Sequence, residues 1–150
     1  AVTRSASAAK GSSVPDLRSK VKLLSEQPLF LKILATVIIP PAFGAITGLA
    51  LGWSAPVYWS LLVVSVVGGL GAGYEHRTGA AGLLRGAWGA LLFASGILAA
   101  YVASGWSAVT HLPQPACVFL VINIVAGSIF GLIGGRARGR AESLVGSQPA

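Results

Sequence analysis

The stretch GGLGAGYEHRTGAAGLLR, residues 68–85, decides the fold of this chain. It begins inside a long apolar run, crosses a short polar turn (Glu75-His76-Arg77) and re-enters a second apolar run. Together with Arg85, this turn holds all of the Asp, Glu, Lys and Arg residues between Lys32 and Arg136. A short charged turn between two apolar runs is typical of two membrane-spanning helices joined by a brief connection.

The composition extends this interpretation to the whole chain. Of its 150 residues, 54% are hydrophobic and only 10% are charged, whereas soluble domains carry about 25% charged residues. Residues 33–74 and 86–135 contain no Asp, Glu, Lys or Arg. A spanning helix needs roughly 20 mostly apolar residues, so each block is long enough for two spans. The sequence therefore predicts an all-α integral membrane protein with four transmembrane helices and no soluble domain.

The four spans are predicted at about 29–53, 57–74, 80–103 and 116–135, within a membrane domain covering 28–135. Residues 1–14 are interpreted as a flexible tail, and 136–150 as a flexible basic tail. Pro15-Asp16 is typical of a helix start, and the apolar residues that follow share one face. We therefore expect a short basic amphipathic helix at 15–27 on the membrane surface, the alternative being a solvated basic linker.

Glycine spacing predicts how the spans pack. Small residues four apart let two helices approach closely in lipid, where apolar surface gives helices no reason to associate. The glycines expected at such contacts are Gly44, Gly48, Gly52, Gly69, Gly73, Gly82, Gly86, Gly127, Gly131 and Gly135. Most lie in the halves of spans 2, 3 and 4 nearest the charged ends, so these spans are expected to converge there. Pro40 and Pro41 should kink the first span and free backbone carbonyls that need another partner.

The basic residues predict the orientation. They flank the spans, and loops after the first and third spans hold none, so both termini and the turn at 75–77 are expected in the cytoplasm. Aromatic residues at the opposite boundary agree with this: Trp53, Tyr58, Trp59, Tyr101 and Trp106. The net charge of +7 is then explained by contact with lipid headgroups and not by nucleic acid. The residues expected at headgroups are Arg18, Lys20, Lys22, Lys32, Arg136, Arg138 and Arg140.

Few residues are candidates for a chemical site. The turn Glu75-His76-Arg77 with Arg85 is either a topology signal or a contact for a headgroup, a partner or a pigment. Asn123, deep in the fourth span, either hydrogen-bonds between helices or lines a polar path. Cys117 is expected to be a buried thiol. No catalytic set, metal site or cofactor is predicted, although a bound lipid or pigment stays open.

The sequence therefore favours a small non-catalytic membrane protein that acts through helix contacts. It would serve as an accessory, assembly or scaffold subunit of a membrane complex, or as a homo-oligomer, with the bilayer and other subunits or itself as partners. The alternative is an oligomeric channel or a transporter of small solutes or lipids, suggested by Pro40-Pro41, Asn123 and a faint similarity between 66–79 and 125–139. The expected location is a bacterial plasma membrane, or an organelle membrane such as that of a plastid after removal of a transit peptide.

Overall fold

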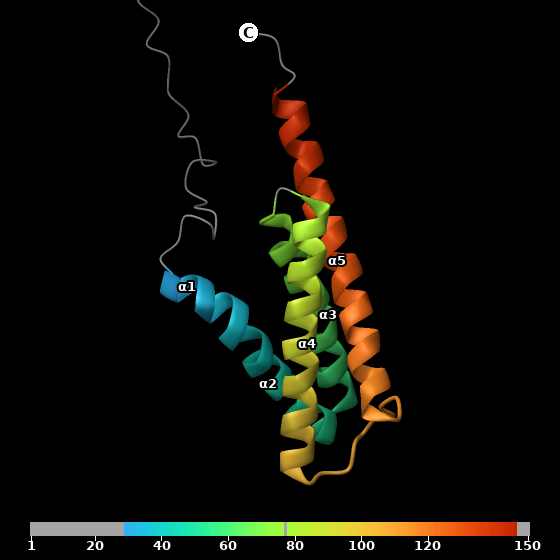
Figure 1. Cartoon of the computed structure of the whole chain (residues 1–150). Coiled ribbons are helices and arrows are strands. Elements are labelled where there is room, and N and C mark those ends of the chain that lie inside the picture. Colours follow the sequence, from blue (N-terminus) through green and yellow to red (C-terminus); the bar gives the residue numbers. More distant parts are fainter. Residues whose placement is uncertain (1–28, 77, 147–150) are drawn as a thin grey trace, which may run out of the picture.

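The computed structural model describes residues 29–76 and 78–146, and every regular element within them is a helix. In chain order these are α1 (Leu29–Ile33), the π-helical segment η3 (Leu34–Ile38), α2 (Ile39–Trp53), α3 (Ala55–Tyr74), α4 (Gly79–Ser104) and α5 (Ala116–Gly146) (Figure 1). The predicted tail at 1–14 and interfacial segment at 15–27 lie outside the described residues, as do Arg18, Lys20, Lys22 and Arg77.

Four of these helical stretches are long and apolar enough to cross a membrane, judged by length and composition. The first combines α1, η3 and α2 into one stretch over Leu29–Trp53, and the others are Ala55–Tyr74, Gly79–Ser104 and Ala116–Ser143. The prediction of an all-helical chain with four such helices is therefore confirmed. In the text below, the turn end of the bundle is the end at residues 75–78, and the loop end is the opposite end.

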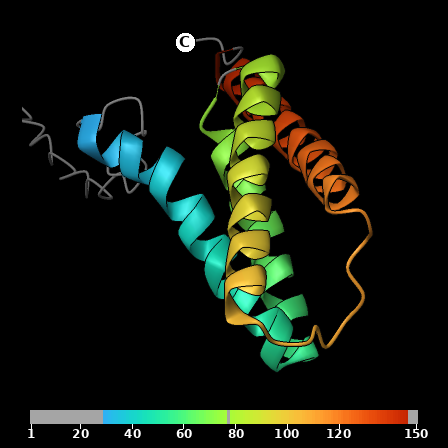
Figure 2. The same cartoon turned by 60° about the horizontal axis from the view of Figure 1, so that its bottom comes forward.

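The first helix leaves the bundle toward its start. α2 packs against α4 near the loop end, whereas α1 diverges from α3, α4 and α5, as both views show (Figures 1 and 2). The π-helical segment η3 lies just before the two prolines at 40 and 41. Since proline has no backbone N–H, the regular pattern of helical hydrogen bonds cannot continue there. The segment of α1 and η3 is called the arm below.

The residues at the helix ends explain where α3 and α4 begin and where α4 stops. α3 starts directly after Ser54 with Pro56 in its first turn, where a missing N–H costs nothing. Thr78 caps α4, because its Oγ1 accepts a hydrogen bond from the backbone N–H of Ala81 at 3.3 Å. α4 ends at Gly105, whose φ of 65° suits the left-handed end of a helix.

The last helix is longer than the predicted span. α5 does not end near Gly135 but continues to Gly146, so the part of the predicted flexible tail up to that residue is helical. The residues after 135 are mostly Arg, Ala, Glu and Leu, which favour helix. Arg138 Nε also donates to Glu142 Oε1 at 2.9 Å, one turn along the same helix. The apolar run ends at Gly135, but nothing there terminates the helix.

The apolar core lies between the middle of the bundle and the loop end. One cluster contains Phe93, Ala94, Ile97 and Phe119, and a second contains Ala50, Leu51 and Tyr58. The loop after α4 joins the second cluster, because the N–H of Val109 donates to the carbonyl oxygen of Leu51 at 2.9 Å.

Two expectations about single side chains need correction. Tyr58 is only 3% exposed and packs in the core, so it is not part of an aromatic belt facing the lipid. Its position in the first turn of α3 turns the ring toward α2 instead of outward. Cys117, expected to be buried, is exposed in the first turn of α5, beyond the core.

Candidate functional site

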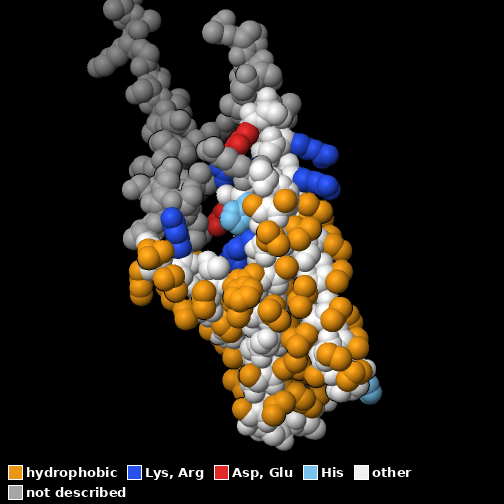
Figure 3. Space-filling view, viewed as in Figure 1, with side chains coloured by type: hydrophobic (Ala, Val, Ile, Leu, Met, Phe, Trp, Pro, Cys, Tyr) orange, Lys and Arg blue, Asp and Glu red, His pale blue; other side chains and the backbone are white. Residues whose placement is uncertain are grey.

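Charged side chains gather at the turn end. Figure 3 shows the described acidic and basic groups above a long surface of hydrophobic and uncharged side chains. They come from all parts of the bundle, because α1 carries Lys32, the end of α3 is followed by Glu75, α4 carries Arg85 and α5 carries Arg138. Arg136 and Arg140 are exposed on the extended end of α5.

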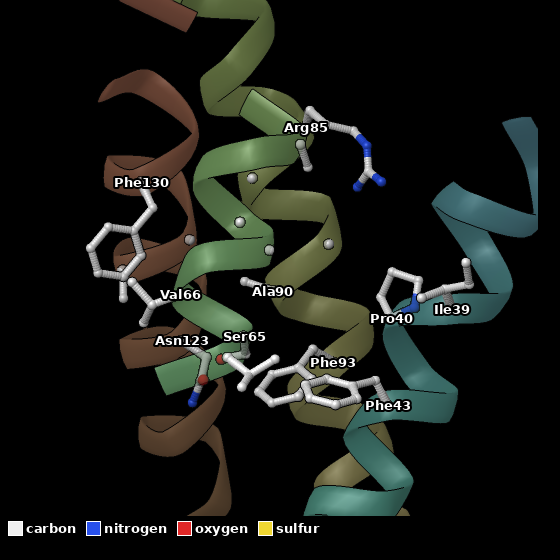
Figure 4. A pocket seen from close by; sticks show the side chains of 18 of the residues that line it. Ile39, Pro40, Phe43, Ser65, Val66, Arg85, Ala90, Phe93, Asn123 and Phe130 are labelled. Carbon is white, nitrogen blue, oxygen red and sulfur yellow. The ribbon is translucent and has the colours of Figure 1, made fainter. Parts of the chain in front are cut away.

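A cavity of about 460 Å³ extends from this charged end into the apolar part of the bundle. Its walls come from the arm and α2 on one side and from α3, α4 and α5 on the other (Figure 4). Arg85 lies at its turn end, and the stacked rings of Phe43 and Phe93, whose centroids are 5.8 Å apart, lie at its other end. The remaining lining is mostly apolar, with Asn123 and Ser65 as the other polar side chains.

Arg85 crosses this cavity to the arm. Its Nη2 donates to the carbonyl oxygen of Ala35 at 3.1 Å, and Figure 4 shows the side chain directed from α4 toward the helix that carries Pro40. The Ala35 carbonyl needs such a donor for a specific reason. The N–H of Ile39, its normal α-helical partner, donates to Leu34 instead, and the next residue, Pro40, has no N–H. The guanidinium therefore satisfies a carbonyl that the prolines leave without a backbone donor.

Glu75 and His76, which lie in the turn, are affected by burial and by the surrounding charge. Partial burial raises the pKa of Glu75 above its ordinary value, although Arg85 and Arg138 oppose this shift. Burial also lowers the pKa of His76, and here Arg85 and Arg138 act in the same direction by repelling the protonated ring. His76 is thus held toward its neutral form while two guanidinium groups lie nearby.

Arg138 reaches the turn only because α5 continues past Gly135. Its Nη1 lies 3.5 Å from the carbonyl oxygens of Tyr74 and Glu75, at the end of α3. Cations near a helix C-terminus interact favourably with its carbonyls and dipole. Sequence reasoning assigned Arg138 to lipid headgroups, because the helical continuation that carries it to α3 had no apolar pattern to reveal it.

Asn123 and Ser65 face the cavity but satisfy their donors locally. Asn123 Nδ2 donates to the carbonyl oxygen of Phe119 at 2.8 Å, and Ser65 Oγ donates to that of Leu62 at 2.7 Å. Each acceptor is in the donor's own helix, so the hydrogen bond between helices expected of Asn123 is not among the bonds that the structure shows. The amide carbonyl of Asn123 accepts no hydrogen bond in the described part of the chain.

The glycines at the turn end lie where three helices meet. A Cβ atom built on Gly73 of α3 would stand 2.5 Å from the carbonyl oxygen of Gly131 in α5, and one built on Gly82 of α4 would overlap the same oxygen. Gly86 meets the backbone of Gly127 in the same way. No side chain could occupy these positions unless the helices moved apart.

A second set of glycines lies where the first helix crosses α4. Cβ atoms on Gly44 and Gly48 of α2 would overlap the backbone of Phe93 and Ile97. Gly96, which sequence reasoning missed, stands against Pro41 in the same way. Gly134 of α5 was also missed, and a Cβ there would stand 2.7 Å from the backbone nitrogen of Tyr74. Both fall outside the four-residue spacing by which the other glycines were selected.

Three of the selected glycines have other surroundings. A Cβ on Gly69 would have Phe130 Cβ at 3.9 Å as its nearest neighbour, an ordinary contact that leaves room for a methyl group. Gly52 meets the side chain of Trp106 and not a helix backbone, and Gly135 meets the turn at Thr78. In addition, Gly68 and Gly71 of α3 have no atom within 4 Å of their Cβ positions.

The groups at this site can attract and orient an anion or an amphiphile. No cluster of three His, Cys, Asp or Glu side chains that could hold a metal ion occurs within residues 29–76 and 78–146. The cavity combines an apolar chamber with a guanidinium at one end, which is the general form of a ligand pocket with a few orienting polar groups. Comparisons with protein-family models, curated proteins and solved structures found no match to this chain.

Proposed function

We propose that this chain is a non-catalytic integral membrane protein that acts through helix contacts, as an accessory, assembly or scaffold subunit of a membrane complex or as a homo-oligomer. In this proposal glycines hold the four-helix bundle together, and both termini face the cytoplasm of a bacterial cell. The crowded Cβ positions described above support the first point. The distribution of basic residues around the spans supports the second.

The observation that carries the proposal is the outward face of α3. Gly71 has open space around its Cβ position, and the neighbouring Val67 and Tyr74 on the same face are exposed. A glycine inside a helix is costly relative to alanine, and this chain otherwise places many of its helical glycines against a second helix. A smooth face with Gly71 at its centre is therefore suited to the close approach of a helix from another subunit or from a second copy.

The test is native purification in mild detergent, with the size of the complex measured and the bound proteins identified by mass spectrometry. We expect the wild-type chain of 15.2 kDa to elute with partners or as a defined oligomer. Gly71→Leu should shift it to the monomer, because the larger side chain holds a neighbouring helix away. Gly71→Ala is the matched control and should retain most of the complex. A wild-type protein that is a uniform monomer without partners would contradict the proposal.

A second candidate function, an oligomeric channel or a carrier of small solutes or lipids, is favoured by the cavity itself. Pro40 and Asn123 both line the cavity, and Ser65 and Arg85 are its other polar side chains. Flux of solutes into proteoliposomes tests this function. Flux that both Asn123→Ala and Pro40→Ala leave unchanged would remove these residues from any transport path, and absence of flux over a broad set of solutes would reject the class.

A further inference from the structure

The cavity between the first helix and α3 has two chemically different parts. At the turn end, Arg85 supplies a guanidinium that is directed toward the arm. Deeper in the bundle the walls are formed by side chains such as Ile39, Phe43 and Leu62, and on the α3 side by the bare backbone of Gly68. A molecule that fits both parts must be anionic at one end and apolar over the rest.

The depth of Arg85 agrees with the position of lipid phosphates. α4 starts at Gly79, so Arg85 lies about 9 Å along the helix at 1.5 Å per residue. The headgroup region is roughly 5–7 Å thick on each side of a bilayer, and an arginine side chain can extend from just inside the hydrocarbon to that region. Arg85 donates one hydrogen bond to Ala35. Because a guanidinium has five N–H donors, others remain for a phosphate.

The apolar part of the cavity suits a lipid chain better than a protein helix, which is about 10 Å across. A flexible hydrocarbon chain is much narrower and can follow the wall past Gly68 toward Phe43 and Phe93. Charge complementarity then selects among lipids, because a guanidinium binds a phosphate strongly, through two parallel hydrogen bonds.

We propose that this cavity is a binding site for an acidic phospholipid, with the phosphate on Arg85 and one acyl chain between the first helix and α3. Glu75 lies in the turn after α3 and interacts electrostatically with Arg85, so it disfavours a headgroup with a large negative charge. A lipid with a single phosphodiester charge is therefore the preferred class. The bound chain fills the space that the divergence of the arm leaves open. This site does not depend on the subunit role proposed above.

The experiment measures lipid adducts of the purified full-length chain by native mass spectrometry. Phosphatidylglycerol and phosphatidylcholine with identical acyl chains are the probes, and we expect about a fivefold preference for phosphatidylglycerol, the effect of one basic side chain near anionic lipid. Glycerol 3-phosphate distinguishes a lipid site from a phosphate site, and it should not displace the lipid. Displacement by glycerol 3-phosphate alone would overturn the assignment to a lipid.

One variant on the cavity wall and a matched control outside the cavity test the contact with the acyl chain. Gly68→Leu fills the chamber, has open space for its side chain, and should weaken binding of phosphatidylglycerol at least fivefold. Gly71→Leu adds the same side chain three residues away, outside the cavity, and should leave lipid binding unchanged even where it disrupts an oligomer. Equal lipid binding by Gly68→Leu and the wild type would overturn the proposal.

Arg85→Gln tests the headgroup contact, since glutamine keeps a hydrogen-bond donor for Ala35 but loses the charge. It should bind the two phospholipids equally. If this variant does not fold, the preference of the wild type can be measured against salt, because screening should reduce it toward equality. A preference for phosphatidylglycerol that persists in the folded variant, or that salt leaves unchanged, would show that Arg85 is not the headgroup site.

Discussion

Arg85 joins the arm to α4 through its hydrogen bond to the carbonyl oxygen of Ala35. A cationic side chain inside a spanning helix is costly, and here the cost is offset by a carbonyl that would otherwise lack a donor. Ala35 is 50 positions away in the chain, and no other hydrogen bond within the described residues joins the arm to α4. The sequence indicated that Pro40 and Pro41 would leave carbonyls in need of partners. It could not indicate which side chain would reach them, because that depends on how the arm packs against α4.

The link between Arg85 and the prolines can be tested by a double-mutant cycle. Arg85→Met should lower the free energy of unfolding in detergent by about 2 kcal/mol, the range for a hydrogen bond to a charged group. Pro40→Ala restores a backbone N–H that can donate to Ala35, so Arg85→Met should cost clearly less in that background. The measured coupling should be about 1 kcal/mol. Additive effects of the two substitutions would show that Arg85 does not serve the carbonyl left free by the proline.

The lowered pKa of His76 predicts that the stability of the protein depends on pH. Because its pKa in the folded protein lies below the ordinary value of 6.5, the unfolded chain binds the proton more readily. Stability is then complete above about pH 6.5 and falls as the pH drops toward the folded pKa. His76→Gln should therefore lose less stability than the wild type between about pH 7.5 and pH 5.5, as measured by thermal unfolding in detergent.

Glu75 and Arg138 provide the controls for this pH effect. The pKa of Glu75 is raised above its ordinary value of 4.5. Its contribution to stability is therefore lost as the pH rises, whereas that of His76 is lost as the pH falls. The contribution of Glu75 is present in both proteins and cancels in their difference. Arg138→Gln removes one of the charges that lower the pKa of His76. It should therefore reduce the loss of stability that the protein shows as the pH falls. Identical pH profiles for the wild type and His76→Gln would contradict the assignment.

At the scale of helices, the sequence predicts well what depends on local composition. An uninterrupted apolar run specifies a helix in lipid regardless of its neighbours, and the observed third helix, Gly79–Ser104, lies close to the predicted 80–103. The end of α5 was missed because the end of an apolar run marks where a helix leaves the hydrocarbon, not where it stops. Residues 136–146 contain no proline, and the helix that they continue carries Arg138 to the end of α3.

The helix crossings give a prediction with an internal control. Gly86→Ala places a methyl group into the backbone of Gly127, so it should lower the free energy of unfolding by about 1–3 kcal/mol, the usual cost of overpacking. Gly69→Ala has room for its methyl group and should be neutral or stabilising by up to about 1 kcal/mol, because alanine favours helix. Unfolding in denaturing detergent followed by circular dichroism measures both. Equal effects of the two substitutions would contradict a role for Gly86 in close packing.

At the scale of the whole molecule, composition determines that the chain forms apolar helices but not how these helices are arranged. The shortage of charged residues requires helices covered by lipid, and this was readable from the two charge-free blocks. The angle of the arm and the cavity behind it depend on which helices pair and where. Gly96 against Pro41 and Phe43 against Phe93 pack the first helix on α4 beyond the arm. These contacts join residues whose spacing in the sequence carries no periodic signal.

The distribution of basic residues predicts the orientation of the molecule in the membrane. With Cys117 replaced by alanine, single cysteines can be placed by Ser107→Cys in the exposed loop after α4 and by Ser143→Cys on the exposed end of α5. Because basic residues flank the turn end and are absent from the loop end, the positive-inside rule places Ser107 outside. A membrane-impermeant maleimide should therefore label Ser107→Cys in intact cells and Ser143→Cys only after lysis. The reverse pattern would invert the topology, and it would place the lipid site at Arg85 in the outer leaflet.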